Sequence, residues 1–298
     1  IQCNQCAFVC PHATIRPFLL NEEEIANAPE LVKSDVVDAK NPLVKKAGLK
    51  YRLQVSPKNC VGCGLCVTEC TANKTGKKAL YMAEAKSQFP QEEAAAYLFK
   101  HVEYKSNIIP TNTVAGYLMP YMEISGACAG CGETPYYRLV SQLFGKDMLV
   151  ANATGCSSIY SGSTPLTPFC TDKNGQGVAW ANSLFEDNAE FGYGMRIATN
   201  YRLMQISTIL SAALEAEDVE SELKEVIKNY LENIKNKDVA RTVAPVLVAL
   251  VKASKNEAVK AVLAYERDLV DKSVWIIGGD GWSYDIGYGG VDHVLAND

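Results

Sequence analysis

Long hydrophobic runs are absent from this sequence, and basic residues are not in excess. No uninterrupted apolar stretch is long enough to span a bilayer, so we expect no membrane partner. The chain has 29 Lys and Arg against 34 Asp and Glu, a formal net charge of −5. Because a nucleic-acid binder needs a basic face to neutralise phosphates, we expect no nucleic-acid partner.

Histidine is also scarce, which bears on how the 11 cysteines are interpreted. The three histidines, His12, His101 and His293, are scattered and lie at no zinc-ligand spacing. Structural zinc is therefore the weaker interpretation. A disulfide framework is also the weaker interpretation, because a chain of 298 residues with 48% hydrophobic content can build a core without disulfide bonds.

Two closely spaced cysteine runs are the strongest signal present. The second run has the spacing C-x2-C-x2-C-x3-C of bacterial two-cluster ferredoxins, whereas the first run lacks its leading cysteine. The fourth cysteine of each run ligates the other cluster in such proteins. We therefore assign one [4Fe–4S] cluster to Cys60, Cys63, Cys66 and Cys10. We assign a second to Cys3, Cys6 and Cys70, with a further cysteine expected just before Ile1.

The chain opens with Ile1 rather than Met and shows no signal-peptide pattern. We therefore expect an excised segment of a longer protein. Oxygen-sensitive clusters indicate a reducing interior.

The pattern of the chain suggests three parts: residues 1–85, a connecting segment 86–122, and residues 123–298. In the first part, the long insert between the cysteine runs is expected to hold a short helix over 21–28, stopped by Pro29, and a strand over 51–55. In the connecting segment we expect a helix over 91–99 and an extended stretch over 108–114. The stretch is expected to be extended because the residue before Pro110 is disfavoured in the helical conformation.

Strands alternate with helices in the last part, which indicates an α/β unit with a parallel sheet. We expect strands over 148–154 and 273–277, the latter buried, and a helix over 136–144 opened by Pro135. A block over about 200–270 has helical apolar periodicity and is expected to be structural.

Gly279-Asp280-Gly281 follows the second of these strands. Glycines allow a backbone to approach a diphosphate, and a carboxylate offers Mg2+ a hard oxygen. The tripeptide alone is as well explained by a tight turn. The glycine-punctuated run Trp282–Gly290 gives it more weight.

A third group of cysteines is Cys128-x2-Cys131 with Cys156. These could hold a third cluster, with Cys170 or a cysteine beyond Asp298 as the fourth ligand, or they could be buried free thiols. Cys170 itself is better interpreted as an ordinary buried thiol.

Four segments together resemble the pyruvate:ferredoxin (or flavodoxin) oxidoreductase family, over nearly the whole chain. They are residues 126–136, 152–160, 180–190 and 279–290. The resemblance implies an α+β ferredoxin-like two-cluster domain followed by an incomplete α/β thiamine-diphosphate domain, with a parallel sheet and helices on both faces.

The resemblance also implies roles for particular residues. Cys128, Cys131 and Cys156 would ligate the cluster nearest the thiamine, and Glu133 and Cys156 would touch thiamine diphosphate. Asp280 would bind Mg2+, and the diphosphate would be lined by Gly281, Trp282 and Ser283. The fourth cluster ligand and the companion Mg2+ ligands would lie after Asp298, so no catalytic residue is assigned in this segment.

The implied activity is the oxidative decarboxylation of pyruvate to acetyl-CoA and CO2. Electrons would pass through three [4Fe–4S] clusters to ferredoxin or flavodoxin, and coenzyme A would bind elsewhere in the enzyme. A homodimer in the cytoplasm, or in an anaerobic organelle of a eukaryote, is expected. Alternatives are another 2-oxoacid:ferredoxin oxidoreductase and a non-catalytic ferredoxin-type electron-transfer module. We expect the chain alone to be inactive.

Overall fold

The computed structural model describes residues 2–77, 79–105, 115–162, 167–284 and 286–297. These residues form two compact units. The first unit comprises Ile1–Lys146 and Ser158–Val178, and the second comprises Asp147–Ser157 and Ala179–Asp298. The division into residues 1–85, 86–122 and 123–298 stays a prediction.

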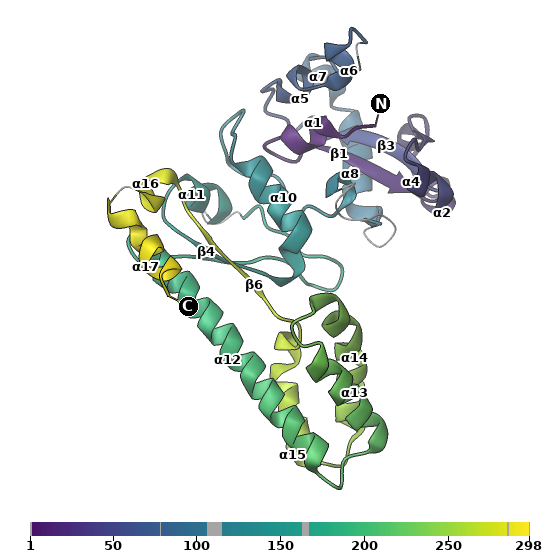
Figure 1. The fold of residues 1–298 in the computed structure, drawn as a ribbon. Helices are drawn as coiled ribbons and strands as arrows, with labels where there is room; N and C mark the ends of the chain where they lie inside the picture. Colours follow the sequence, from purple (N-terminus) through teal and green to yellow (C-terminus); the bar gives the residue numbers. More distant parts are fainter. Residues whose placement is uncertain (1, 78, 106–114, 163–166, 285, 298) are drawn as a thin grey trace. The chain divides into compact units, whose positions relative to one another are not determined.

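The first unit is built on a three-stranded antiparallel sheet in the order β1-β3-β2 (Figure 1). The strands are β1 (Ile15–Leu20), β2 (Val37–Asp38) and β3 (Lys50–Val55). The register pairs Ile15 with Val55 and Leu20 with Lys50. The insert between the cysteine runs therefore folds into a sheet, and its third strand contains the predicted 51–55.

Short helices surround this sheet. They include α1 (Gln5–Val9), α2 (Glu22–Ala26), α3 (Glu30–Lys33), α4 (Pro42–Lys46), α5 (Leu65–Thr68), α6 (Thr71–Lys74), α7 (Ala85–Gln88), α8 (Gln91–His101), η1 (Ala115–Tyr117) and α10 (Thr134–Phe144). The predicted helix at 21–28 is confirmed as α2, which Asn21 and Glu24 close with a reciprocal capping box. The predicted helices at 91–99 and 136–144 are confirmed as α8 and α10.

Strand β1 is buried on both faces. Phe18 and Leu20 pack with Val32 of α3 and Leu98 of α8, while Leu19 packs on the other side with Val44 of α4. Helix α8 therefore contributes to the core of the first unit. The predicted extended stretch 108–114 lies outside the described residues.

The second unit contains a parallel sheet in the order β5-β4-β6. Its strands are β4 (Met148–Asn152), β5 (Ala179–Asn182) and β6 (Ser273–Ile277). Asn152 is level with Asn182 on one side and with Ile277 on the other. The predicted parallel sheet is confirmed. Strand β6 is half-buried along its length rather than buried, because it has a described neighbour only on its β4 side.

Helix α12 (Asn188–Glu215) packs against β4 and β6 with its first turns, and against a helical group with its later turns (Figure 1). The group includes α13 (Ser221–Glu232), α14 (Lys237–Ala253), α15 (Glu257–Lys260) and η3 (Ala261–Asp268). Their shared core includes Leu210, Ile227 and Leu247, each fully buried. The predicted helical block is confirmed, and α12 begins before residue 200.

Three small elements follow β6: α16 (Asp280–Ser283), η4 (Ile286–Gly290) and α17 (Val291–Leu295). Two further elements, η2 (Gly145–Asp147) and α11 (Cys156–Gly162), lie where the chain passes from one unit to the other. Helix α12 packs against the parallel sheet. The expectation of helices on both faces of this sheet stays a prediction.

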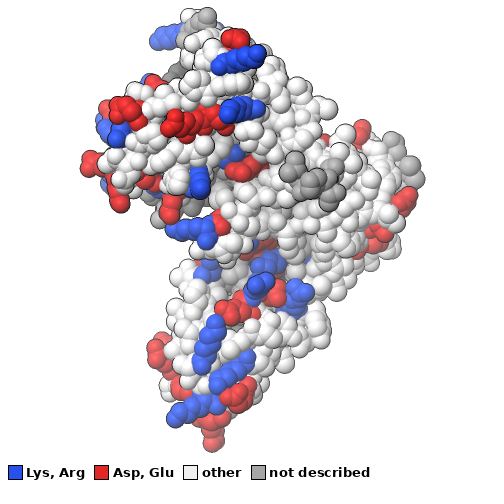
Figure 2. Space-filling model, turned by 180° about the vertical axis from the view of Figure 1, so that it is seen from behind, with Lys and Arg blue, Asp and Glu red and all other residues white. Residues whose placement is uncertain are grey.

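Acidic and basic side chains are intermingled on the face shown in Figure 2, in keeping with the small net charge. No helix in the described part of the chain is both long and apolar enough to cross a membrane.

Candidate metal and cofactor sites

Four predicted ligands line one cavity in the first unit. The cavity has an empty volume of about 430 Å³, and its lining includes Cys10, Cys60, Cys63 and Cys66. Burial raises the pKa of Cys66, and negative charge on the other three cysteines raises it further. The fold thus brings together the four cysteines assigned to one cluster, from both ends of the insert.

A second cavity, wider at about 1060 Å³, is lined by Cys3, Cys6 and Cys70. Burial raises the pKa of Cys6 to about 12, and the charges of Cys66, Cys3 and Cys70 add to the rise. Cys6 therefore lies near both its predicted cluster partners and Cys66 of the neighbouring cavity. The fourth ligand, expected just before Ile1, stays a prediction.

The donor set fits a cluster better than a single ion. Among the described residues, no three His, Cys, Asp or Glu side chains converge as they would around one metal ion. A cubane holds its thiolates apart at its outer corners, so cysteines that line a cavity without converging suit it. The first cavity has the four cysteines that a [4Fe–4S] cluster requires, and the second has three of them.

Hydrogen-bond donors favour the thiolate form of two of these cysteines. Burial raises the pKa of Cys10, but hydrogen bonds from the Thr14 hydroxyl and from nearby backbone amides outweigh it, and the pKa is lowered. Cys3 behaves similarly: burial raises its pKa, and the Thr71 hydroxyl, 3.4 Å from its Sγ, helps to lower it.

The loop that carries Cys128 and Cys131 packs beside the first cavity. The Thr134 hydroxyl donates to the Pro11 carbonyl at 2.8 Å, and His12 Nδ1 donates to the Ser125 carbonyl at 3.1 Å. A Cβ built on Gly130 would lie 3.9 Å from Cys63 Cβ. The loop is therefore anchored at both ends, and its middle touches a predicted cluster ligand.

The remaining cysteines differ in setting. Cys128 is exposed and Cys131 is half-buried, while Cys156 is exposed at the start of α11 in the second unit. Their grouping around a third cluster stays a prediction. Cys170 donates to the Pro120 carbonyl at 3.3 Å, and burial raises its pKa to about 12. That Cys170 is not a cluster ligand stays a prediction.

The carboxyl ends of the three parallel strands carry a buried polar network. Asn152 and Asn188 are fully buried. The Trp180 indole donates to Asn152 Oδ1 at 2.9 Å, and Asn188 Nδ2 donates to the Ile277 carbonyl at 3.1 Å. Ligands of open α/β sheets bind at this edge. The network fixes the ends of β4 and β6 next to the predicted diphosphate residues.

Asp280 follows β6 and opens α16, with an exposed side chain that is free to meet a cation. Gly281 and Ser283 lie on the same short helix. The Trp282 indole is instead buried, packed with Ala153 and Ala189. What Trp282 can offer a diphosphate is therefore its backbone. Glu133 is half-buried at the N-cap position of α10.

The glycines after Trp282 have a physical reason. Gly289 and Gly290 have φ of +53° and +76°, and a Cβ would meet the Trp282 indole in one case and the Glu190 carboxylate in the other. The backbone at Gly289 therefore lies against Trp282, in a space and a conformation that only glycine allows. This glycine run serves packing beside Asp280 as well as any approach to a ligand.

Comparison with known proteins shows what the chain is similar to. Residues 1–74 match the 4Fe-4S dicluster domain. The whole chain is 47% identical, over 308 residues, to a pyruvate:ferredoxin oxidoreductase of Moorella thermoacetica. The chain matches a segment of the pyruvate:ferredoxin (flavodoxin) oxidoreductases.

Other oxidoreductases of this kind agree. The pyruvate-flavodoxin oxidoreductase of Klebsiella pneumoniae is 47% identical over 301 residues, covering 99% of this chain. A mitochondrial pyruvate dehydrogenase [NADP(+)] of Euglena gracilis is 38% identical over 305 residues, also covering 99% of this chain and 16% of that protein. The chain spans 25% of the length of the first two relatives. The resemblance seen in the sequence is confirmed, as is a ferredoxin-type 4Fe-4S domain.

Proposed function

We propose that this chain is the electron-carrying and part of the thiamine-binding portion of an enzyme that oxidatively decarboxylates pyruvate to acetyl-CoA and CO2. The observation that carries the proposal is the serial arrangement of cysteines within the first unit. Cys6 neighbours Cys66 between the two cavities, and a Cβ built on Gly130 of the Cys128–Cys131 loop would lie 3.9 Å from Cys63 Cβ. Such a series suits stepwise electron transfer.

The proposed cofactors are three [4Fe–4S] clusters, thiamine diphosphate and Mg2+. The first cluster would be held by Cys10, Cys60, Cys63 and Cys66, the second by Cys3, Cys6 and Cys70, and the third by Cys128, Cys131 and Cys156. When bound, thiamine diphosphate supplies the carbanion chemistry and the clusters carry single electrons. The chain's own contribution is to hold and orient these groups.

The proposed partners are ferredoxin or flavodoxin as electron acceptor, and pyruvate and coenzyme A as substrates. The names of the Moorella and Klebsiella relatives support the two acceptors. We further propose a homodimer in the cytoplasm, or in an anaerobic organelle if the source is a eukaryote, because the clusters require a reducing interior.

The test uses the complete protein that carries this chain. We expect thiamine diphosphate to bind with Mg2+ in titration calorimetry, and pyruvate with coenzyme A to reduce ferredoxin or flavodoxin. No detectable thiamine diphosphate binding would favour a plain electron-transfer module. Faster turnover of 2-oxoglutarate or a branched 2-oxoacid than of pyruvate would identify another 2-oxoacid oxidoreductase.

The site at Asp280 has its own prediction. Asp280→Asn removes the charge offered to Mg2+, so we expect at least a tenfold loss of Mg2+-dependent thiamine diphosphate affinity, about 1.4 kcal/mol. The iron–sulfur absorbance should be unchanged. Asp292→Asn, on α17 in the same unit, is the matched control and should bind normally. Equal affinity in the two variants would contradict the assignment of Asp280.

A further inference from the structure

Three arginines in the first unit have buried side chains, and one of them has no counterion. Arg16 pairs with Glu123 at 2.7 Å, and Arg52 pairs with Asp35 at 3.4 Å. Within the described part of the chain, no carboxylate pairs with Arg138, although only 5% of its surface is exposed. A buried charge without a partner is strongly destabilising. The partners that the structure gives the Arg138 guanidinium are backbone carbonyls.

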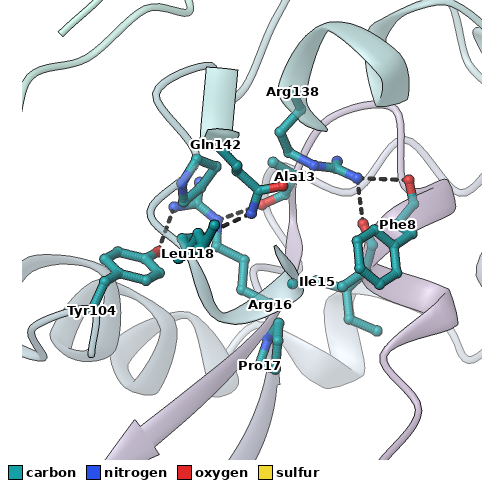
Figure 3. A pocket seen from close by; sticks show the side chains of 12 residues that line it. Phe8, Ala13, Ile15, Arg16, Pro17, Tyr104, Leu118, Arg138 and Gln142 are labelled. Atoms are coloured by element: carbon teal, nitrogen blue, oxygen red, sulfur yellow. Dashed lines mark hydrogen bonds between the residues drawn. The ribbon is translucent and has the colours of Figure 1, made fainter. Parts of the chain in front are cut away.

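The contacts of Arg138 all lie on the turn that presents Cys10. From α10, its guanidinium donates to the carbonyls of Ala7 and Phe8, with the Phe8 contact at 2.7 Å (Figure 3). It also donates to the Cys10 carbonyl. These carbonyls lie at the end of α1, where helix carbonyls lack intrahelical partners. Arg138 thus fixes the backbone that places the Cys10 sulfur at its cavity.

The charge on Arg138 is permanent near neutral pH. An arginine guanidinium is not deprotonated in proteins, so Arg138 carries a full positive charge at neutral pH. Cys10, whose carbonyl Arg138 contacts, lines the cavity in which the thiolates of Cys60, Cys63 and Cys66 would also gather.

We propose that Arg138 is a positioning residue whose charge compensates the cluster held by Cys10, Cys60, Cys63 and Cys66 and raises its reduction potential. This rests on the proposed function, because it requires that cluster. One-electron reduction adds one negative charge to the cluster with its thiolates and moves no proton. A fixed positive charge stabilises the reduced form more than the oxidised form, so reduction becomes easier.

The test compares two variants that separate charge from hydrogen bonding. Arg138→Gln keeps one donor group without the charge, and Arg138→Lys keeps the charge with fewer well-placed donors. Arg52→Gln is the matched control, since Arg52 is equally buried and donates to the Val32 carbonyl but contacts no cysteine in the described residues. All are made in the complete cluster-loaded protein.

The measurement is a redox titration with dithionite as electron donor, followed by electron paramagnetic resonance. The signal of this cluster is identified by its change in Cys63→Ser. At fixed solution potential, Arg138→Gln should lower the ratio of reduced to oxidised cluster about tenfold, a shift of about 59 mV for a one-electron couple. Arg138→Lys should keep most of the parent potential, and Arg52→Gln all of it.

Two results overturn the proposal: an unchanged potential in Arg138→Gln, or an equal shift in Arg52→Gln. If Arg138→Gln does not fold, Arg138→Lys tests the proposal instead. Its reduction potential should stay close to that of the parent protein. Amide hydrogen exchange in α1 should be faster, because one ammonium group cannot bind three carbonyls as well as a guanidinium can. The proposal is also overturned if Arg138→Lys lowers the reduction potential by the full shift of about 59 mV expected for Arg138→Gln. A parent protein that binds no cluster contradicts the proposed function instead.

Discussion

At the scale of single residues, the described structure surrounds the predicted ligands with groups that tune them. Thr14 and Thr71 place hydroxyls beside the Cys10 and Cys3 sulfurs, and Arg138 places a cation beside Cys10. The cysteine assignments came from spacing alone. These neighbours could not be predicted that way, because Arg138 meets Cys10 only through tertiary contact across more than a hundred residues.

Thr71 gives a test at this scale. Thr71→Val keeps the shape of the side chain but removes the hydroxyl that lies 3.4 Å from Cys3 Sγ. A hydrogen bond to sulfur favours the reduced, more negative cluster. In Thr71→Val we therefore expect a few-fold lower ratio of reduced to oxidised cluster at fixed potential, which corresponds to the loss of a hydrogen bond worth about 1 kcal/mol. A redox titration of the same kind measures it, with the signal of the cluster held by Cys3, Cys6 and Cys70 identified by its change in Cys6→Ser. Thr71→Ser should behave as the parent, and a valine variant with parental potential would refute the role.

At the scale of elements, two strands show why sequence patterns miss structure. Strand β1 contains Pro17 and buried Arg16, which argue against a strand, yet it lies at the edge of its sheet, where proline is tolerated. Arg16 is accommodated by Glu123 and the Tyr104 hydroxyl. Strand β5 is short and exposed at both ends, so its place beside β4 came only with the fold.

Helix α12 offers an element-scale prediction in two neighbouring glycines. A Cβ at Gly192 would meet Ile276 at 2.4 Å and Ala151 at 3.2 Å, whereas Gly194 has open space around it. We expect Gly192→Ala to destabilise the protein by about 1–3 kcal/mol through overpacking against the sheet. Gly194→Ala should stabilise it by about 0.5–1 kcal/mol, because alanine loses less backbone entropy in a helix. Denaturant unfolding measures both, and the same sign for the two changes would be inconsistent with this packing.

At the scale of the whole molecule, the two units depend differently on metal. The first unit contains both cysteine runs, and its small core clusters include Cys6 and Cys10 themselves. Residues 179–298 contain no cysteine and have a continuous apolar core around Leu210, Ile227 and Leu247. The periodicity of that block made its helices predictable, whereas the cysteine-bearing loops depend on distant contacts.

Removing the clusters should therefore act locally. After oxidative removal of iron in the presence of a chelator, we expect α1 and α5 to lose protection from amide hydrogen exchange, because their cysteines lose the group that joins them. Helices α13 and α14 should keep theirs. Mass spectrometry of exchanged peptides reads out both regions, with an untreated sample as control. Equal loss in α13 and α14 would show that the core of the second unit is not independent of the metal.

The anchored turn at Cys10 has a consequence for cofactor maturation. Cys60 and Cys63 are exposed and Cys66 is half-buried, whereas Cys10 is buried and already set in place by Arg138. In a folded chain, the thiols that an incoming cluster would meet first are therefore those of Cys60 and Cys63, and the buried Cys10 thiol would bind it from the inner side.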